Sequence, residues 1–222
     1  MKRVSLKVNL FNVFAATVLM CSCGPRPSEL QLVQDLGVGT AVPHLTTTAN
    51  GSPTLLCVQS SDTTHRLTHR LWEAGSWGEA RTIAEDTAML VNWADRPQLA
   101  FGPDGAAYAH WLRLDERGDF AYTIQAVRSN DGGKSWSEPV SPHKTERVAE
   151  YGFAQWMPFD GGAALAWLDG REFNENPDPS TAHMEVRLAR WLSDRPWSEE
   201  TVLDSSACTC CPMSTLVHPS GP

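Results

Sequence analysis

Tryptophan recurs along this chain at a nearly constant interval, and that interval constrains the fold more than any other feature. Trp77, Trp136 and Trp197 lie 59 and 61 residues apart. Each is preceded by a run of alternating apolar and polar residues, and such alternation is typical of half-buried strands. Prolines repeat at a similar distance, since Pro43 and Pro97 are 54 residues apart. A period of this length indicates similar structural units placed one after another.

Each unit contains four short strand-like runs separated by glycine-containing turns, and no sustained helical period follows residue 30. Four-stranded units repeated radially form a β-propeller. We therefore predict an all-β fold, a β-propeller of four-stranded antiparallel blades, with blades at about 43–92, 93–150 and 151–205. Residues 206–222 start a fourth unit. Because a ring needs about four to eight blades to close, we expect a truncated piece of a longer protein. A β-sandwich with chance spacing is the alternative.

Residues 129–136 read Ser-Asn-Asp-Gly-Gly-Lys-Ser-Trp, which is the pattern of a tight turn. Asp131 can accept hydrogen bonds from backbone N–H groups two or three residues later. The two glycines permit a positive φ, and the final tryptophan starts the returning strand. The segment resembles the Asp box, or BNR repeat, of sialidase-like β-propellers, where it is a structural turn. Five residues carry the resemblance: Ser129, Asp131, Gly133, Ser135 and Trp136.

The resemblance implies that residues 30–222 form a partial sialidase-like β-propeller. It implies an exo-sialidase-like glycoside hydrolase, or a glycan-handling protein, whose partner is a glycan or glycoconjugate. Sialidases bind the sugar carboxylate with an arginine cluster, and use a carboxylic acid and a tyrosine nucleophile. We expect the nucleophile and later arginines in the missing part, so this piece alone is expected to be inactive. A non-catalytic propeller that binds glycan or protein is the rival interpretation.

In a four-stranded meander, the loops between second and third strands share one end with the blade-to-blade connections, and this end holds the long charged loops. Arg96 and Arg171 are the candidate substrate-binding residues there, because a guanidinium donates two parallel hydrogen bonds to a carboxylate. Asp169 and Glu172 are the weaker catalytic candidates. A structural role is the alternative for both arginines, with Arg171 salt-bridged beside Asp169 and Glu172.

Residues 1–22 have the features of a signal peptide. Three basic residues precede an apolar stretch that is shorter than the roughly 18 residues of a spanning helix. Ser22 before Cys23 resembles a bacterial lipobox, so Cys23 is the predicted lipidation site and residues 23–29 a tether. We expect an exported protein, lipid-anchored in the bacterial cell envelope at the periplasmic or outer-membrane face, with plain secretion as the alternative.

Charge excludes one class of partner. The formal net charge is −8, and removal of the three basic residues of the leader makes it −11. An acidic surface repels nucleic acid and anionic lipid. We therefore expect no nucleic acid partner, and contact with a membrane through the lipid anchor only.

Three cysteines, Cys208, Cys210 and Cys211, lie within four residues of one another. Adjacent cysteines pair only through a strained ring, so the expected bridge joins Cys208 to Cys211 or to a partner in the missing blades. A soft-metal site for Cu(I) or Zn(II) is the second interpretation, because thiolates favour these ions. A redox-active thiol is the third interpretation. The second and third interpretations add a further functional alternative, a metal-binding or redox protein of the cell envelope. No other cofactor is expected, and Cys57 reads as a buried strand residue.

Overall fold

Every element of the computed structural model is a β-strand in the part of the chain that it describes, residues 35–216 apart from 104, 160, 174–182 and 194. The chain divides into two units, Met1–Asp35 and Leu36–Pro222, and all the strands belong to the second. The predicted signal peptide, the tether and Cys23 lie outside the described residues. Within them, no helix is long and apolar enough to cross a bilayer.

The first sheet is an antiparallel meander. Its strands pair in the order β1, β2, β3 and β5, and the short β4 pairs with the end of β3. Their bounds are β1 Thr40–Thr47, β2 Pro53–Ser60, β3 His65–Glu73, β4 Ser76–Trp77 and β5 Arg81–Asp86.

The second and third sheets repeat this order. The second sheet contains β6 Gln98–Phe101, β7 Ala107–Leu114 and β8 Tyr122–Ser129, and an isolated bridge from Ala126 to Val140 adds a remnant of an outer strand. The third sheet contains β9 Tyr151–Phe159, β10 Gly162–Asp169, β11 Met184–Leu192 and β12 Thr201–Ala207. All pairings are antiparallel between neighbours in sequence.

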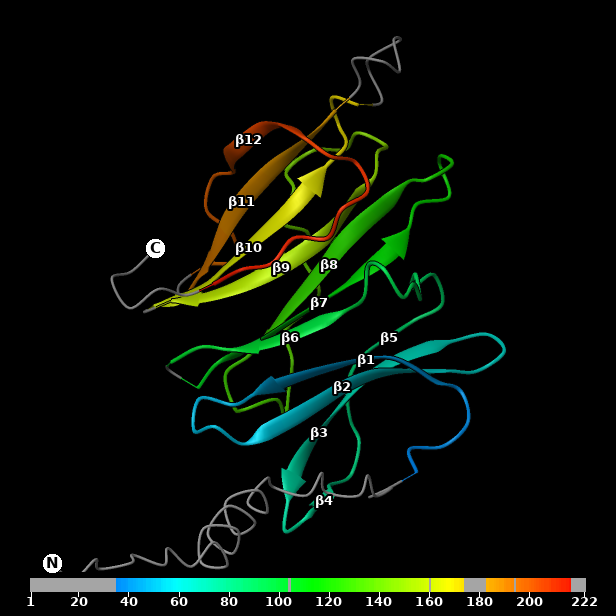
Figure 1. The fold of residues 1–222 in the computed structure, drawn as a ribbon, viewed down its shortest axis with the longest axis vertical. Coiled ribbons are helices and arrows are strands. Elements are labelled where there is room, and N and C mark those ends of the chain that lie inside the picture. Colours follow the sequence, from blue (N-terminus) through cyan, green and yellow to red (C-terminus); the bar gives the residue numbers. More distant parts are fainter. Residues whose placement is uncertain (1–34, 104, 160, 174–182, 194, 217–222) are drawn as a thin grey trace, which may run out of the picture. The chain divides into compact units, whose positions relative to one another are not determined.

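The first strands of the three sheets are neighbours in space, since β1 contacts β6 and β6 contacts β9. Figure 1 shows the sheets following one another in chain order. We call β1, β6 and β9 the inner strands. Four-stranded meanders with adjacent first strands are the blades of a propeller. The predicted fold class is confirmed: the chain is a partial β-propeller.

Two hydrophobic cores lie between successive sheets, and β7 contributes to both. Trp111 packs with Leu56 and Leu67 of the first sheet, whereas Tyr108 packs with Trp156 and Trp167 of the third sheet. Alternate residues of a strand face opposite sides, so a strand between two blades is apolar on both. This is why β7 reads as a nearly continuous apolar run.

The turn at residues 129–136 closes through Asp131, as predicted, but the backbone donors lie three and four residues later rather than two or three. Asp131 Oδ1 accepts hydrogen bonds from the backbone N–H groups of Lys134 and Ser135, both at 2.9 Å, and its Oδ2 accepts one of 2.6 Å from Ser135 Oγ. Gly133 has φ +86°, and a Cβ there would lie 2.8 Å from the ring of His69 in the first sheet. His69 Nε2 lies 3.0 Å from Gly133 O, so the turn also joins two blades.

Candidate functional site

The long connections gather at one end of the sheets. The inner strands β6 and β9 begin here at Gln98 and Tyr151, and β7 and β10 finish here at Leu114 and Asp169. We call this the connection end. The opposite end, which we call the turn end, carries the hairpin turns and the turn at residues 129–136. Loops positioned by a rigid sheet are where binding residues concentrate.

Asp95 lies in the connection between β5 and β6, with 8% of its surface exposed. Its Oδ2 accepts a hydrogen bond of 2.7 Å from the backbone N–H of Phe153 in β9. A Cβ at Gly152 would overlap this oxygen, so glycine is required there. Burial raises the pKa of Asp95 to about 6, against the opposing effect of the Phe153 hydrogen bond, and the charge of Glu150 adds to the rise. A carboxyl group that holds its proton near neutral pH can serve as a general acid.

Glu150 and Tyr122 share this environment. Burial raises the pKa of Glu150. Burial also raises the pKa of Tyr122, the first residue of β8, and the charges of Glu150 and Asp95 raise it further. Two carboxyl groups and a phenol therefore interact at the junction of the second and third sheets. Such a set of groups with shifted pKa values is typical of a functional site.

Two aromatic side chains at the connection end face solvent. Trp93 is 85% exposed and Phe120 is 77% exposed. Asn92 Oδ1 accepts a hydrogen bond of 2.8 Å from the backbone N–H of Ala94, which fixes the turn that carries Trp93. The sequence placed Arg96 at this end but did not identify Trp93 as a binding residue. One sequence feature could have indicated it: Trp93 lies outside the runs of alternating apolar and polar residues that predict strands.

Arg171 is held by two carboxylates rather than presented to solvent. Its Nε lies 2.7 Å from Asp169 Oδ1, and its Nη2 lies 2.6 Å from Asp169 Oδ2 and 2.9 Å from Glu200 Oε2. Its side chain is 11% exposed, and that of Asp169 is fully buried. Trp167 Nε1 donates a further hydrogen bond of 2.8 Å to Asp169. Arg171 therefore has the structural role given above as the alternative to substrate binding. Its partners are Asp169 and Glu200, rather than Asp169 and Glu172.

Glu172 instead pairs with Arg147 at 3.2 Å, where both side chains are about half exposed. Arg96 is exposed, and among the described residues it forms no ion pair. Its charge contributes to lowering the pKa of His44 to about 4, although burial is the larger cause. Of the two predicted carboxylate-binding arginines, Arg96 is the one with a guanidinium open to an anion.

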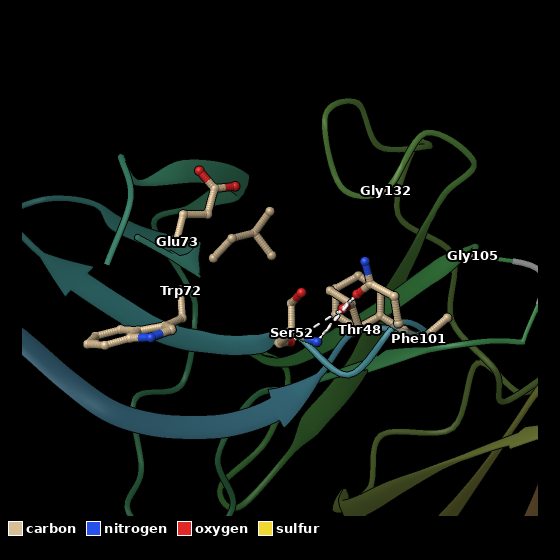
Figure 2. Close-up of a pocket in the computed structure, with 10 residues that line it drawn as sticks. Thr48, Ser52, Trp72, Glu73, Phe101, Gly105 and Gly132 are labelled. Carbon is tan, nitrogen blue, oxygen red and sulfur yellow. Dashed lines mark hydrogen bonds between the residues drawn. The ribbon is translucent and has the colours of Figure 1, made fainter. Parts of the chain in front are cut away.

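A pocket of about 370 Å³ lies at the turn end, between the β1–β2 turn and the second sheet (Figure 2). Among the residues that the structure describes, Glu73 is the one titratable lining residue, so this described lining lacks the interacting acids of the connection end. A second hollow of about 320 Å³ follows the inner strands. Its polar lining includes residues from all three of them: His44, Gln98 and Gln155.

The cysteine triplet follows β12 at the connection end, because Ala207, the last residue of β12, pairs with Met184, the first residue of β11. The Sγ atom of Cys208 lies 3.5 Å from that of Cys210 and 3.3 Å from that of Cys211, and the remaining pair is 4.0 Å apart. All three side chains are exposed, and the four described cysteines are free. Cys57 is buried in β2, as predicted.

No protein-family model matches the chain, and no curated protein matches it. Among solved structures, the chain is similar to an endo-arabinase from Bacteroides thetaiotaomicron, with 12% identity, a TM-score of 0.45, and coverage of 84% of this chain and 63% of that one. It is also similar to an α-L-arabinofuranosidase from Clostridium thermocellum, with 12% identity, a TM-score of 0.44, and coverage of 73% and 52%. The chain thus spans less than two thirds of either protein.

Proposed function

We propose that this protein binds glycans at the connection end of a cell-envelope β-propeller and acts on them as a glycoside hydrolase. The observation that carries the proposal is the position of the exposed indole of Trp93, two residues before the buried carboxyl group of Asp95. An exposed aromatic face offers a large rigid contact surface to a sugar ring. A carboxyl group with a raised pKa beside a second carboxyl group is the arrangement that glycosidic bond cleavage uses.

In the catalytic form of this proposal, Asp95 is the general acid. Its pKa of about 6 means that about half of the Asp95 carboxyl groups hold a proton at pH 6 and about a tenth at pH 7. The sialidase-type form adds Arg96 as the cation for the sugar carboxylate. It also assigns the nucleophile to Tyr122, in place of the residue that the resemblance led us to expect outside this chain; the charges of Glu150 and Asp95 act on Tyr122. Asp169 and Arg171 have a supporting role here, since they hold one another and Glu200 inside the third blade.

A non-catalytic glycan-binding propeller is the second candidate, and one observation favours it. Asp95 is 8% exposed, and its Oδ2 already joins the β5–β6 connection to β9 through the Phe153 N–H. A carboxyl group used in this way can fix the shape of the connection end without transferring a proton. Trp93 and Arg96 then bind the ligand alone, and the protein needs no lidded or water-free site.

Binding is tested with α2,3-sialyllactose and lactose, followed by isothermal titration calorimetry. Trp93→Ala should abolish binding of both sugars without lowering the melting temperature, because the indole is 85% exposed. Leu203→Ala, an exposed residue of the outer strand β12, is the matched control and should bind as the unchanged protein does. Retention of full affinity in Trp93→Ala would refute the glycan face proposed here.

Specificity and catalysis need separate measurements. Arg96→Ala should weaken binding of sialyllactose and leave lactose binding unchanged, whereas equal effects on both sugars contradict carboxylate recognition. Hydrolysis of a fluorogenic sialoside by the protein should be lost in Asp95→Asn and Tyr122→Phe. In the unsubstituted protein, the pH profile should fall as pH rises through about 6, as Asp95 loses its proton. Binding without hydrolysis supports the second candidate.

A further inference from the structure

We propose that Cys208, Cys210 and Cys211 form a three-thiolate binding site for a Cu(I) ion. This inference is independent of the glycan site, because it uses none of the residues assigned there. The three Sγ atoms lie within 4.8 Å of one another, and the three side chains are exposed. An ion can therefore reach the sulfur atoms without unfolding the protein.

The distances fit three ligands around one ion. Metal–thiolate bonds are about 2.3 Å long. Three sulfur atoms at that distance from a central ion are about 4.0 Å apart in a planar triangle and about 3.8 Å apart on three corners of a tetrahedron. The observed separations are 3.3, 3.5 and 4.0 Å. Small rotations about the side-chain bonds are sufficient to admit the ion.

The spacing of the triplet brings the three thiols to one point. Thr209 is the single residue between Cys208 and Cys210, and the chain forms a turn at Thr209 and Cys210. The three Sγ atoms therefore lie on the same side of this turn, within 4.0 Å of one another.

Both sides of the triplet are fixed to the third blade. On one side Ala207 pairs with Met184 in the sheet. On the other side Thr215 Oγ1 donates a hydrogen bond of 3.0 Å to the carbonyl oxygen of Trp156, in the inner strand β9. A loop held at both ends loses less conformational entropy when it closes around an ion. The site is therefore built into the blade-to-blade connection.

The donor set selects the ion. Thiolates are soft ligands that select Cu(I), Zn(II) and iron–sulfur clusters. Structural zinc sites are almost always four-coordinate, and the cluster of metal-binding side chains in the described chain contains only these three cysteines. Three thiolates without a nitrogen or oxygen ligand favour Cu(I). Binding involves no oxidation or reduction: Cu(I) replaces the thiol protons, which pass to the solvent.

The test is an anaerobic titration of the reduced full chain with Cu(I), with bathocuproine disulfonate as the competing chelator. We expect one Cu(I) per chain and an X-ray absorption spectrum with three sulfur neighbours at about 2.3 Å. Cys208→Ser, Cys210→Ser and Cys211→Ser should each weaken binding by more than about tenfold, because even the loss of groups that only orient metal ligands costs that much. Cys57→Ala, which removes a buried thiol in β2, is the control and should bind normally.

Alkylation with iodoacetamide provides a second measurement that does not depend on a variant that folds. In the unsubstituted protein, Cu(I) should protect the three exposed cysteines from modification, as mass spectrometry of the peptides reports. Undiminished binding in Cys210→Ser, a stoichiometry of zero, or preference for Zn(II) over Cu(I) each overturns the proposal. The proposal is also overturned if the isolated protein contains a Cys208–Cys211 disulfide and Cu(I) does not bind to these cysteines even when reductant is present.

Discussion

Replacing Arg171 with alanine tests whether this arginine stabilises the third blade or binds a ligand. Its guanidinium makes two bonds with Asp169, of 2.6 and 2.7 Å, and one of 2.9 Å with Glu200. The Asp169 side chain is fully buried, and that of Glu200 is 9% exposed. The substitution removes the cation and leaves two shielded carboxylates behind.

The expected cost follows from this burial. Breaking a buried ion pair by removing one partner costs about 3–5 kcal/mol, because an uncompensated charge stays inside the protein. Arg187 remains near both carboxylates, 3.9 Å from Asp169 and 3.0 Å from Glu200, and offsets part of the loss. We therefore expect about 3 kcal/mol, at the lower end of the range. For a domain of this size that corresponds to a fall of about 6–12 °C in the melting temperature.

The assay is thermal unfolding followed by circular dichroism, with urea unfolding as a second measure. Arg66→Ala is the matched control: Arg66 pairs with Glu85 at 2.6 Å, but both side chains are about half exposed. An exposed pair of this kind contributes about 0–1 kcal/mol, so the control should melt close to the unchanged protein. If Arg171→Ala melts like Arg66→Ala yet loses affinity for sialyllactose, the structural explanation is wrong and Arg171 binds ligand, as the sequence resemblance implied.

Three further predictions concern pH and backbone. Burial lowers the pKa of His110 to about 3, so its contribution to stability is complete above about pH 6.5 and is lost as pH falls toward 3. In His110→Phe, the loss of unfolding free energy between pH 7.5 and pH 5, measured by urea unfolding, should be smaller. An unchanged dependence of stability on pH would contradict this prediction. Burial raises the pKa of Asp95 to about 6, so its contribution is complete below about pH 4 and is lost as pH rises through 6. Asp95→Asn should therefore gain stability relative to the unchanged protein between pH 4 and pH 7, and a constant difference across that window would disprove the raised pKa. Gly133→Ala should lower the free energy of unfolding by about 2 kcal/mol, because φ is +86° and the new Cβ meets the His69 ring 2.8 Å away. A melting temperature equal to that of the unchanged protein would show that the two blades are not in contact there.

Features that depend on short-range or repeated interactions could be predicted from the sequence. The repeat of Trp77, Trp136 and Trp197 predicted the blades because each period of four strands carries its own alternation and turns. Asp131 could be assigned to its turn because its hydrogen-bond partners lie within four residues. In each case the deciding interaction is either short-range or repeated.

The site depended on contacts between residues distant in the chain, which a single sequence does not specify. Asp95 acquires its raised pKa from burial against β9, 58 residues later. Arg171 is neutralised by Glu200, which arrives beside it only when β12 joins the sheet. A charged side chain has the same sequence signature whether it faces solvent or a buried partner. Strand periodicity therefore determined the fold, while desolvation and charge pairing, set by how the blades pack, decided which charged groups remain available for function.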